Sequence, residues 1–146
     1  MKQSTEMCDK IMSILSQDAK TLMSWGANKA FGVSTDGRIG LVIFVDAFKH
    51  QGPVAIFPTE HSRFYDVEVQ DSERNILKSI ECVPEESLVE NIDRLVEVTE
   101  HYDDDLDRWL LSTPSDVKSS QQLGRILKRC PEAAEKVHIY LDMVKR

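Results

Sequence analysis

A chain of 146 residues with 41% hydrophobic and 29% charged side chains has the size and composition of one globular domain, and it is too apolar for a disordered protein. Its formal net charge of −7 argues against bulk affinity for nucleic acid, because phosphates attract clustered Lys and Arg. The longest apolar run, residues 41–45, is far shorter than the roughly 20 residues that cross a bilayer. With no export signal at the N-terminus, we expect a cytoplasmic protein without a membrane segment.

The first segment predicts an amphipathic helix over residues 4–24. Apolar side chains recur there at steps of three and four, and charged ones fall on the opposite side. Trp25-Gly26 is expected to end this helix, because glycine takes the left-handed C-terminal position at little cost.

The next sixty residues predict strands at 28–34, 41–45, 54–57, 64–69 and 76–83. Asp36-Gly37 suits a tight hairpin turn, and the unbroken apolar run 41–45 suits a central strand. Pro53 and Pro58 bracket the third strand, which favours an edge or a terminus of the sheet. Because the connections are too short for helices, we expect an antiparallel meander of four or five strands.

After Val83 the pattern becomes helical. Pro84 and two glutamates predict the start of a helix that runs to about residue 100, and shorter helices are expected to begin near Asp104, at Thr113 and at Pro131. The chain is thus expected to form one α+β domain over residues 1–146: N-terminal helix, four- to five-stranded antiparallel meander, helical C-terminal half. Residues 102–146 could pack as a semi-independent helical lobe. The expected core includes Leu41, Ile43, Val45, Val67, Leu88, Ile92 and Leu95.

Charge is divided unevenly along the second half of the chain. Residues 81–107 carry eleven acidic side chains and the single cation Arg94, whereas residues 108–146 carry eight Lys or Arg and four acids. Such blocks form a solvated face, complement one another within the chain, or meet a charged partner. The partner-binding candidates are the acidic Glu86, Glu90 and Asp93, and the cationic Arg125, Lys128 and Arg129.

Acidic side chains are also potential metal ligands. His101 and its acidic neighbours lack the central glycine of an EF-hand, so a solvated helix cap or a partner-binding patch is expected there instead. Asp46 and Glu68 offer an alternative, a divalent-metal-dependent nuclease, although the Lys that usually accompanies such acids is missing. The three cysteines are far apart and are expected to be buried free thiols.

Three segments and a helix carry a resemblance to known proteins. Residues 25–31 (WGANKAF), 48–54 (FKHQGPV) and 64–69 (FYDVEV), followed by the 88–97 helix, resemble small α+β proteins of unknown function encoded on bacterial mobile elements and phages. These proteins share the helix, the short meander and the acidic helix after it. They have no catalytic signature, so the resemblance implies an accessory or inhibitor protein and assigns no residue a role.

We therefore expect a small acidic, non-enzymatic protein that binds another macromolecule through charged surface. No nucleophile–base pair and no cofactor loop is recognisable, so no catalytic residue, cofactor or metal is assigned. A protein partner is favoured over nucleic acid, although a local basic patch stays open. Pairing of the opposite charge blocks between two copies of the chain is a further arrangement.

Overall fold

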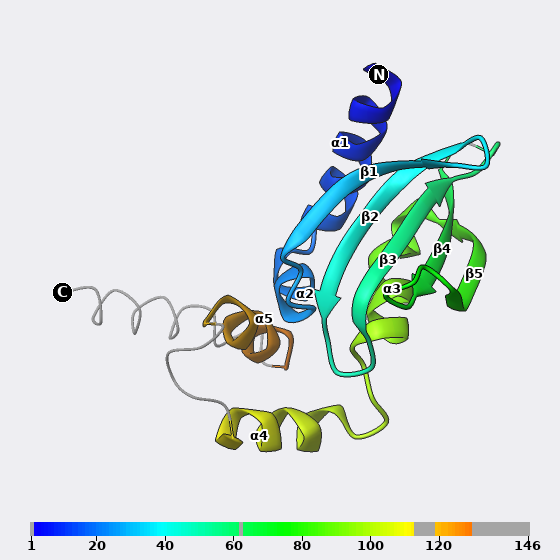
Figure 1. Ribbon diagram of the computed structural model, residues 1–146. Coiled ribbons are helices and arrows are strands. Elements are labelled where there is room, and N and C mark those ends of the chain that lie inside the picture. Colours follow the sequence, from blue (N-terminus) through cyan, green and yellow to red (C-terminus); the bar gives the residue numbers. More distant parts are fainter. Residues whose placement is uncertain (1, 62, 113–118, 130–146) are drawn as a thin grey trace.

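An antiparallel sheet of five strands, with helices packed on one of its faces, organises the chain (Figure 1). The structure is a computed structural model that describes residues 2–61, 63–112 and 119–129. The expected α+β fold is confirmed, with helices before the sheet, a meander, and helices after it. The strands are β1 (Lys29–Thr35), β2 (Arg38–Asp46), β3 (Gln51–Pro58), β4 (Phe64–Gln70) and β5 (Ile76–Pro84).

The N-terminal segment forms two helices, α1 (Lys2–Ser16) and α2 (Ala19–Ser24), so the prediction of one helix is wrong at the junction. Asp18 begins the second helix, because its Oδ1 accepts a hydrogen bond from the Thr21 backbone N–H at 3.4 Å. Gly26, with φ +65°, follows the end of α2, as expected for a glycine at this position.

The strands follow one another in spatial order β1-β2-β3-β4-β5, all antiparallel. Asp36 and Gly37 form the predicted tight turn with φ values of 52° and 76°. The third strand, however, is the middle strand and not an edge. Pro53 pairs only with β2 and Pro58 only with β4, so each proline has a side without a partner strand, where its missing N–H costs no ladder bond.

The core lies between the sheet and the helices behind it in Figure 1. Helix α3 (Leu88–Val96) follows a 3-10 turn at Glu85–Ser87, so the predicted 85–100 helix is shorter than expected. Leu95 is partly buried and packs against the core. The other predicted core residues are all at most 4% exposed: Leu41, Ile43, Val45, Val67, Leu88 and Ile92.

The opposite face of the sheet, which faces the reader in Figure 1, carries a smaller apolar cluster. It consists of Val42, Ala55 and Phe57, with Val33 and Phe44 beside them. The guanidinium of Arg38 covers the Phe57 ring at 4.0 Å. We call this face the open face.

Two cysteines differ in burial. Cys8 is half-buried with its Sγ 3.8 Å from the Gly40 carbonyl oxygen, and burial, followed by the charge of Asp9, raises the pKa of its thiol. Cys82 is exposed, which contradicts the expected buried thiol, because β5 is an edge strand and most of its side chains face solvent. The third, Cys130, lies outside the described residues.

The C-terminal half begins with α4 (Tyr102–Ser112) and continues with α5 (Ser119–Arg129). Helix α5 packs along α2, where a Cβ on Gly124 would lie only 2.6 Å from the Lys20 carbonyl oxygen. The helix starts expected at Thr113 and Pro131 fall outside the described residues. No helix in the described ranges is both long and apolar enough to span a bilayer.

Candidate functional site

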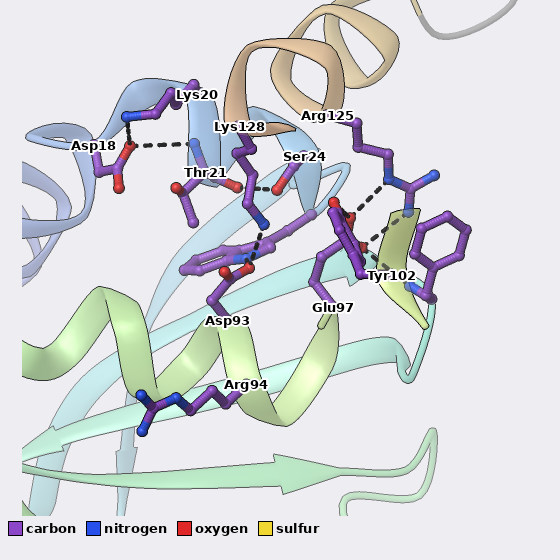
Figure 2. Close-up of polar contacts among 12 residues, drawn as sticks. Asp18, Lys20, Thr21, Ser24, Asp93, Arg94, Glu97, Tyr102, Arg125 and Lys128 are labelled. Atoms are coloured by element: carbon purple, nitrogen blue, oxygen red, sulfur yellow. Dashed lines mark hydrogen bonds and ion pairs between the residues drawn. The ribbon is translucent and has the colours of Figure 1, made fainter. Parts of the chain in front are cut away.

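A buried ion pair joins α5 to the segment that follows α3 (Figure 2). Arg125 donates from Nε to Glu97 Oε2 at 2.8 Å and from Nη2 to Glu97 Oε1 at 2.9 Å. The two side chains are 2% and 0% exposed. The guanidinium lies 3.7 Å from the Phe48 ring centroid and 4.2 Å from that of Trp109. The charge of Arg125 is therefore neutralised and enclosed inside the fold.

Glu97 receives two further hydrogen bonds. The Phe48 backbone N–H donates to Oε1 at 3.2 Å, and the Tyr102 hydroxyl donates to Oε2 at 2.5 Å. Burial raises the pKa of Tyr102 above its ordinary value, and the hydrogen bond to Glu97 raises it further. The hydroxyl thus stays protonated and able to donate, and both oxygens of the buried Glu97 carboxylate have hydrogen-bond partners.

The other two predicted cations of α5 also face acidic side chains of this chain. Lys128 Nζ lies 2.7 Å from Asp93 Oδ1, which also accepts a hydrogen bond from Trp25 Nε1 at 2.8 Å. Arg129 pairs with Asp107 of α4. Pairing of the basic residues with acids of the same chain is one of the alternatives that the sequence predicted. It reduces the positive charge available on the surface.

The predicted acidic candidates lie together in a groove between the α1–α2 junction and α3. Its volume is about 320 Å³. The groove, which we call the acidic groove, contains Glu86, Glu90 and Asp93 and adds two acids that the sequence did not single out. Its lining residues are Ile14, Gln17, Asp18, Thr21, Glu85, Glu86, Val89, Glu90 and Asp93. Five of these nine are acidic and none is a cation.

Exposed cations pair with three acids of the acidic groove. The pairs are Lys20 with Asp18 at 3.2 Å, Lys10 and Arg63 with Glu85 at 3.9 Å, and Arg94 with Glu90 at 2.6 Å. Exposed pairs of this kind contribute only about 0–1 kcal/mol. Glu86 is exposed and has no ion-pair partner among the residues that the structure describes. The acidic groove can therefore accept further positive charge.

Asp18 is ionised at neutral pH. Burial raises the pKa of this carboxyl, but hydrogen bonds from Thr21 and Lys20 lower it by more, so the net effect is a pKa below the ordinary value. The carboxylate contributes a full negative charge to the acidic groove.

Asp46 and Glu68, the residues of the nuclease alternative, do not converge. Asp46 pairs with Gln51 of β3, whereas Glu68 pairs with Ala55. Four positions along a strand correspond to about 13 Å, and the two acids lie on different sides of β3. Glu68 is already held by Arg38 Nη1 at 3.2 Å.

Other acids that could bind a metal are also used within the fold or lie apart. Glu97 is buried against Arg125. Three aspartates lie in the first turn of α4, where their negative charge interacts favourably with the positive end of the helix dipole: Asp103, Asp104 and Asp105. Across residues 2–61, 63–112 and 119–129, no three His, Cys, Asp or Glu side chains are grouped as metal ligands would be.

Comparisons with known proteins identified no relative. No family model matches the chain, and neither a curated protein nor a solved structure matches it.

Proposed function

We propose that this protein is non-enzymatic and binds a positively charged segment of another protein through the acidic groove. It would act in the cytoplasm as an accessory or inhibitor protein, the role that the resemblance to proteins of bacterial mobile elements and phages implies. This proposal rests on the charge distribution of the described residues and on the residues that line the groove.

The observation that carries the proposal is that the cations of α5 form ion pairs within the same chain. Arg125, Lys128 and Arg129 each pair with an acid of the same chain, so they offer little charge to an acidic partner. Of the five carboxylates that line the acidic groove, Asp93 is also the partner of Lys128, three are paired with exposed cations, and Glu86 has no ion-pair partner among the described residues. The charge remaining at the surface therefore favours a cationic partner over an acidic one.

The composition of the acidic groove suits a Lys or Arg side chain. Ile14 and Val89 supply apolar surface within the lining, against which the aliphatic part of such a side chain can pack while its charged end meets a carboxylate. Lys128 gives an example within the chain, because its ammonium reaches Asp93, one of the lining residues.

Electrostatic attraction of this kind speeds association and weakens with added salt. The experiment is an affinity pull-down from the native host with two matched variants. Glu86→Lys/Glu90→Lys reverses two charges in the groove, and Glu73→Lys/Glu81→Lys reverses two exposed acids near β5. Both change the net charge equally, so only a partner bound at the groove is lost specifically with the first variant. Equal recovery with both variants would contradict the proposal.

A calorimetric titration separates this proposal from the nuclease alternative. The proposal predicts no stoichiometric binding of Mg²⁺ or Mn²⁺ and no metal-dependent cleavage of DNA or RNA. Cleavage that disappears in Asp46→Ala or Glu68→Ala would favour the nuclease instead.

A further inference from the structure

The two edges of the sheet differ in how they are protected. Strand β1 pairs with β2 through seven consecutive residues without a register shift, and no strand among the described residues pairs with its other side. From Ala30 to Thr35 it contains no charged residue and no proline. All of its residues except Val33 are exposed. Such an edge presents unpaired N–H and C=O groups that can bind another strand.

Strand β5, at the opposite edge, has features that discourage pairing. Two register shifts interrupt its ladder with β4, and Cys82 within it has a φ of 55°. Lys78 and Glu81 place charges along its length. Bulges and charged side chains on edge strands are common means of preventing edge-to-edge association. The contrast singles out β1 as the edge that is open to a partner strand.

We infer that two copies of this chain associate through β1, antiparallel to each other about a twofold axis at Gly32, so that their sheets join into one. Gly32 is the middle residue of β1, and a twofold axis there uses the whole strand. The same patch of each copy then contacts itself, as in the commonest form of homodimer. This inference does not depend on the proposed function.

The side chains of β1 suit this register on both faces of the joined sheet. Phe31, which is 47% exposed on the open face, would lie opposite Val33 of the second copy and become covered. A Cβ on Gly32 would lie 2.9 Å from Cys8 Sγ, so Gly32 faces the helix side. Ala30 and Ser34 share that side by strand alternation, so β1 has only small residues at these three positions on the side where α1 lies over Gly32.

Charge at the two ends of β1 is complementary in this register. Lys29 would lie opposite Thr35 of the second copy and beside its Asp36, and the symmetry creates this contact twice. Within the described part of one copy, neither Lys29 nor Asp36 has an ion-pair partner. Cross-strand pairs of opposite charge stabilise antiparallel strands modestly and help to fix their register.

Sedimentation equilibrium over a range of protein concentrations tests the inference, with circular dichroism to show that each variant is folded. We expect wild-type protein to dimerise, Phe31→Glu to be monomeric, and the control Leu77→Glu on β5 to dimerise like the wild type. Lys29→Glu should raise the dimer dissociation constant about tenfold, the order expected when two exposed ion pairs become repulsive. Lys29→Glu/Asp36→Lys should restore it.

A folded wild type that stays monomeric at every concentration would overturn the inference. A dimer that survives Phe31→Glu, or one that Leu77→Glu disrupts, would also overturn it, because association would then use another surface.

Discussion

Arg125 and Glu97 form a bidentate ion pair, with contacts of 2.8 and 2.9 Å, between two side chains that are almost fully removed from solvent. The pair fixes α5 to the end of α3 and neutralises the cation that the sequence placed in the basic block. A buried pair of this kind is retained only where its desolvation is offset by further hydrogen bonds, which Phe48 and Tyr102 supply here.

Removing one member of this pair should destabilise the fold strongly. Arg125→Met leaves Glu97 buried without its counter-ion, so we expect the free energy of unfolding to fall by about 3–5 kcal/mol. Chemical denaturation monitored by circular dichroism measures this value. Arg125→Met/Glu97→Gln is the control, and it should lose less than the single variant because no uncompensated charge remains. A double variant as unstable as the single one would contradict the electrostatic explanation.

Gly124→Ala should destabilise the protein although alanine is the better helix former. The new Cβ would lie 2.6 Å from the Lys20 carbonyl oxygen and 2.7 Å from the Ser24 backbone nitrogen, so α5 must move away from α2. We expect a loss of about 1–3 kcal/mol in the free energy of unfolding, larger than the gain of roughly 1 kcal/mol from helix propensity. Ser120→Ala, at an exposed position of the same helix, serves as the control and should be neutral or slightly stabilising.

Truncation of Ile43 and of Leu95 should lower the free energy of unfolding by different amounts, although the sequence predicts both residues to be in the core. Ile43 is 1% exposed, so Ile43→Ala should lower the free energy of unfolding by about 2–5 kcal/mol. Leu95 is only partly buried against the core, and Leu95→Ala should cost less. Thermal and chemical denaturation of both variants check the order. A greater loss at Leu95 would contradict the placement of α3 on the sheet.

Stability should depend on the ionisation of Asp18 in acid. Its folded pKa is lowered below the ordinary value of 3.8, so its stabilising effect is present above the unfolded pKa and is lost as the pH falls through the folded pKa. Asp18→Asn keeps a capping oxygen but cannot ionise, and Asp18→Ala removes the cap at a cost of about 1 kcal/mol. Melting temperatures measured from neutral pH downward should show wild type and Asp18→Asn converging in acid. A constant difference between them would argue against the charged cap.

Much of the fold was predictable because its determinants are local. The alternation of Tyr65, Val67 and Val69 places them on the core face of β4, and Asp36-Gly37 marks the first hairpin. The order of the strands followed from their short connections. The break between α1 and α2 was missed because the apolar pattern continues across Gln17 and Asp18 without a glycine or proline.

The position of β3 and the pairing of charges depend on contacts between distant residues. Prolines at both ends of a strand indicate an edge unless each lies where one neighbour is absent, and only the register shows this. Likewise, the spacing of Arg125, Lys128 and Arg129 predicts a shared helical face but not that its partners are Glu97, Asp93 and Asp107. The acidic groove also includes Asp18, which lies some seventy residues before α3 in the chain.

The most direct test of the central claim is the affinity of the purified host partner measured across a series of salt concentrations. With wild type and with Glu73→Lys/Glu81→Lys, we expect similar affinity that falls as salt is added. Glu86→Lys/Glu90→Lys should weaken binding at least about tenfold at low salt, and its affinity should depend less on salt. If both double variants weaken binding equally, or if neither does, the acidic groove is not the binding surface.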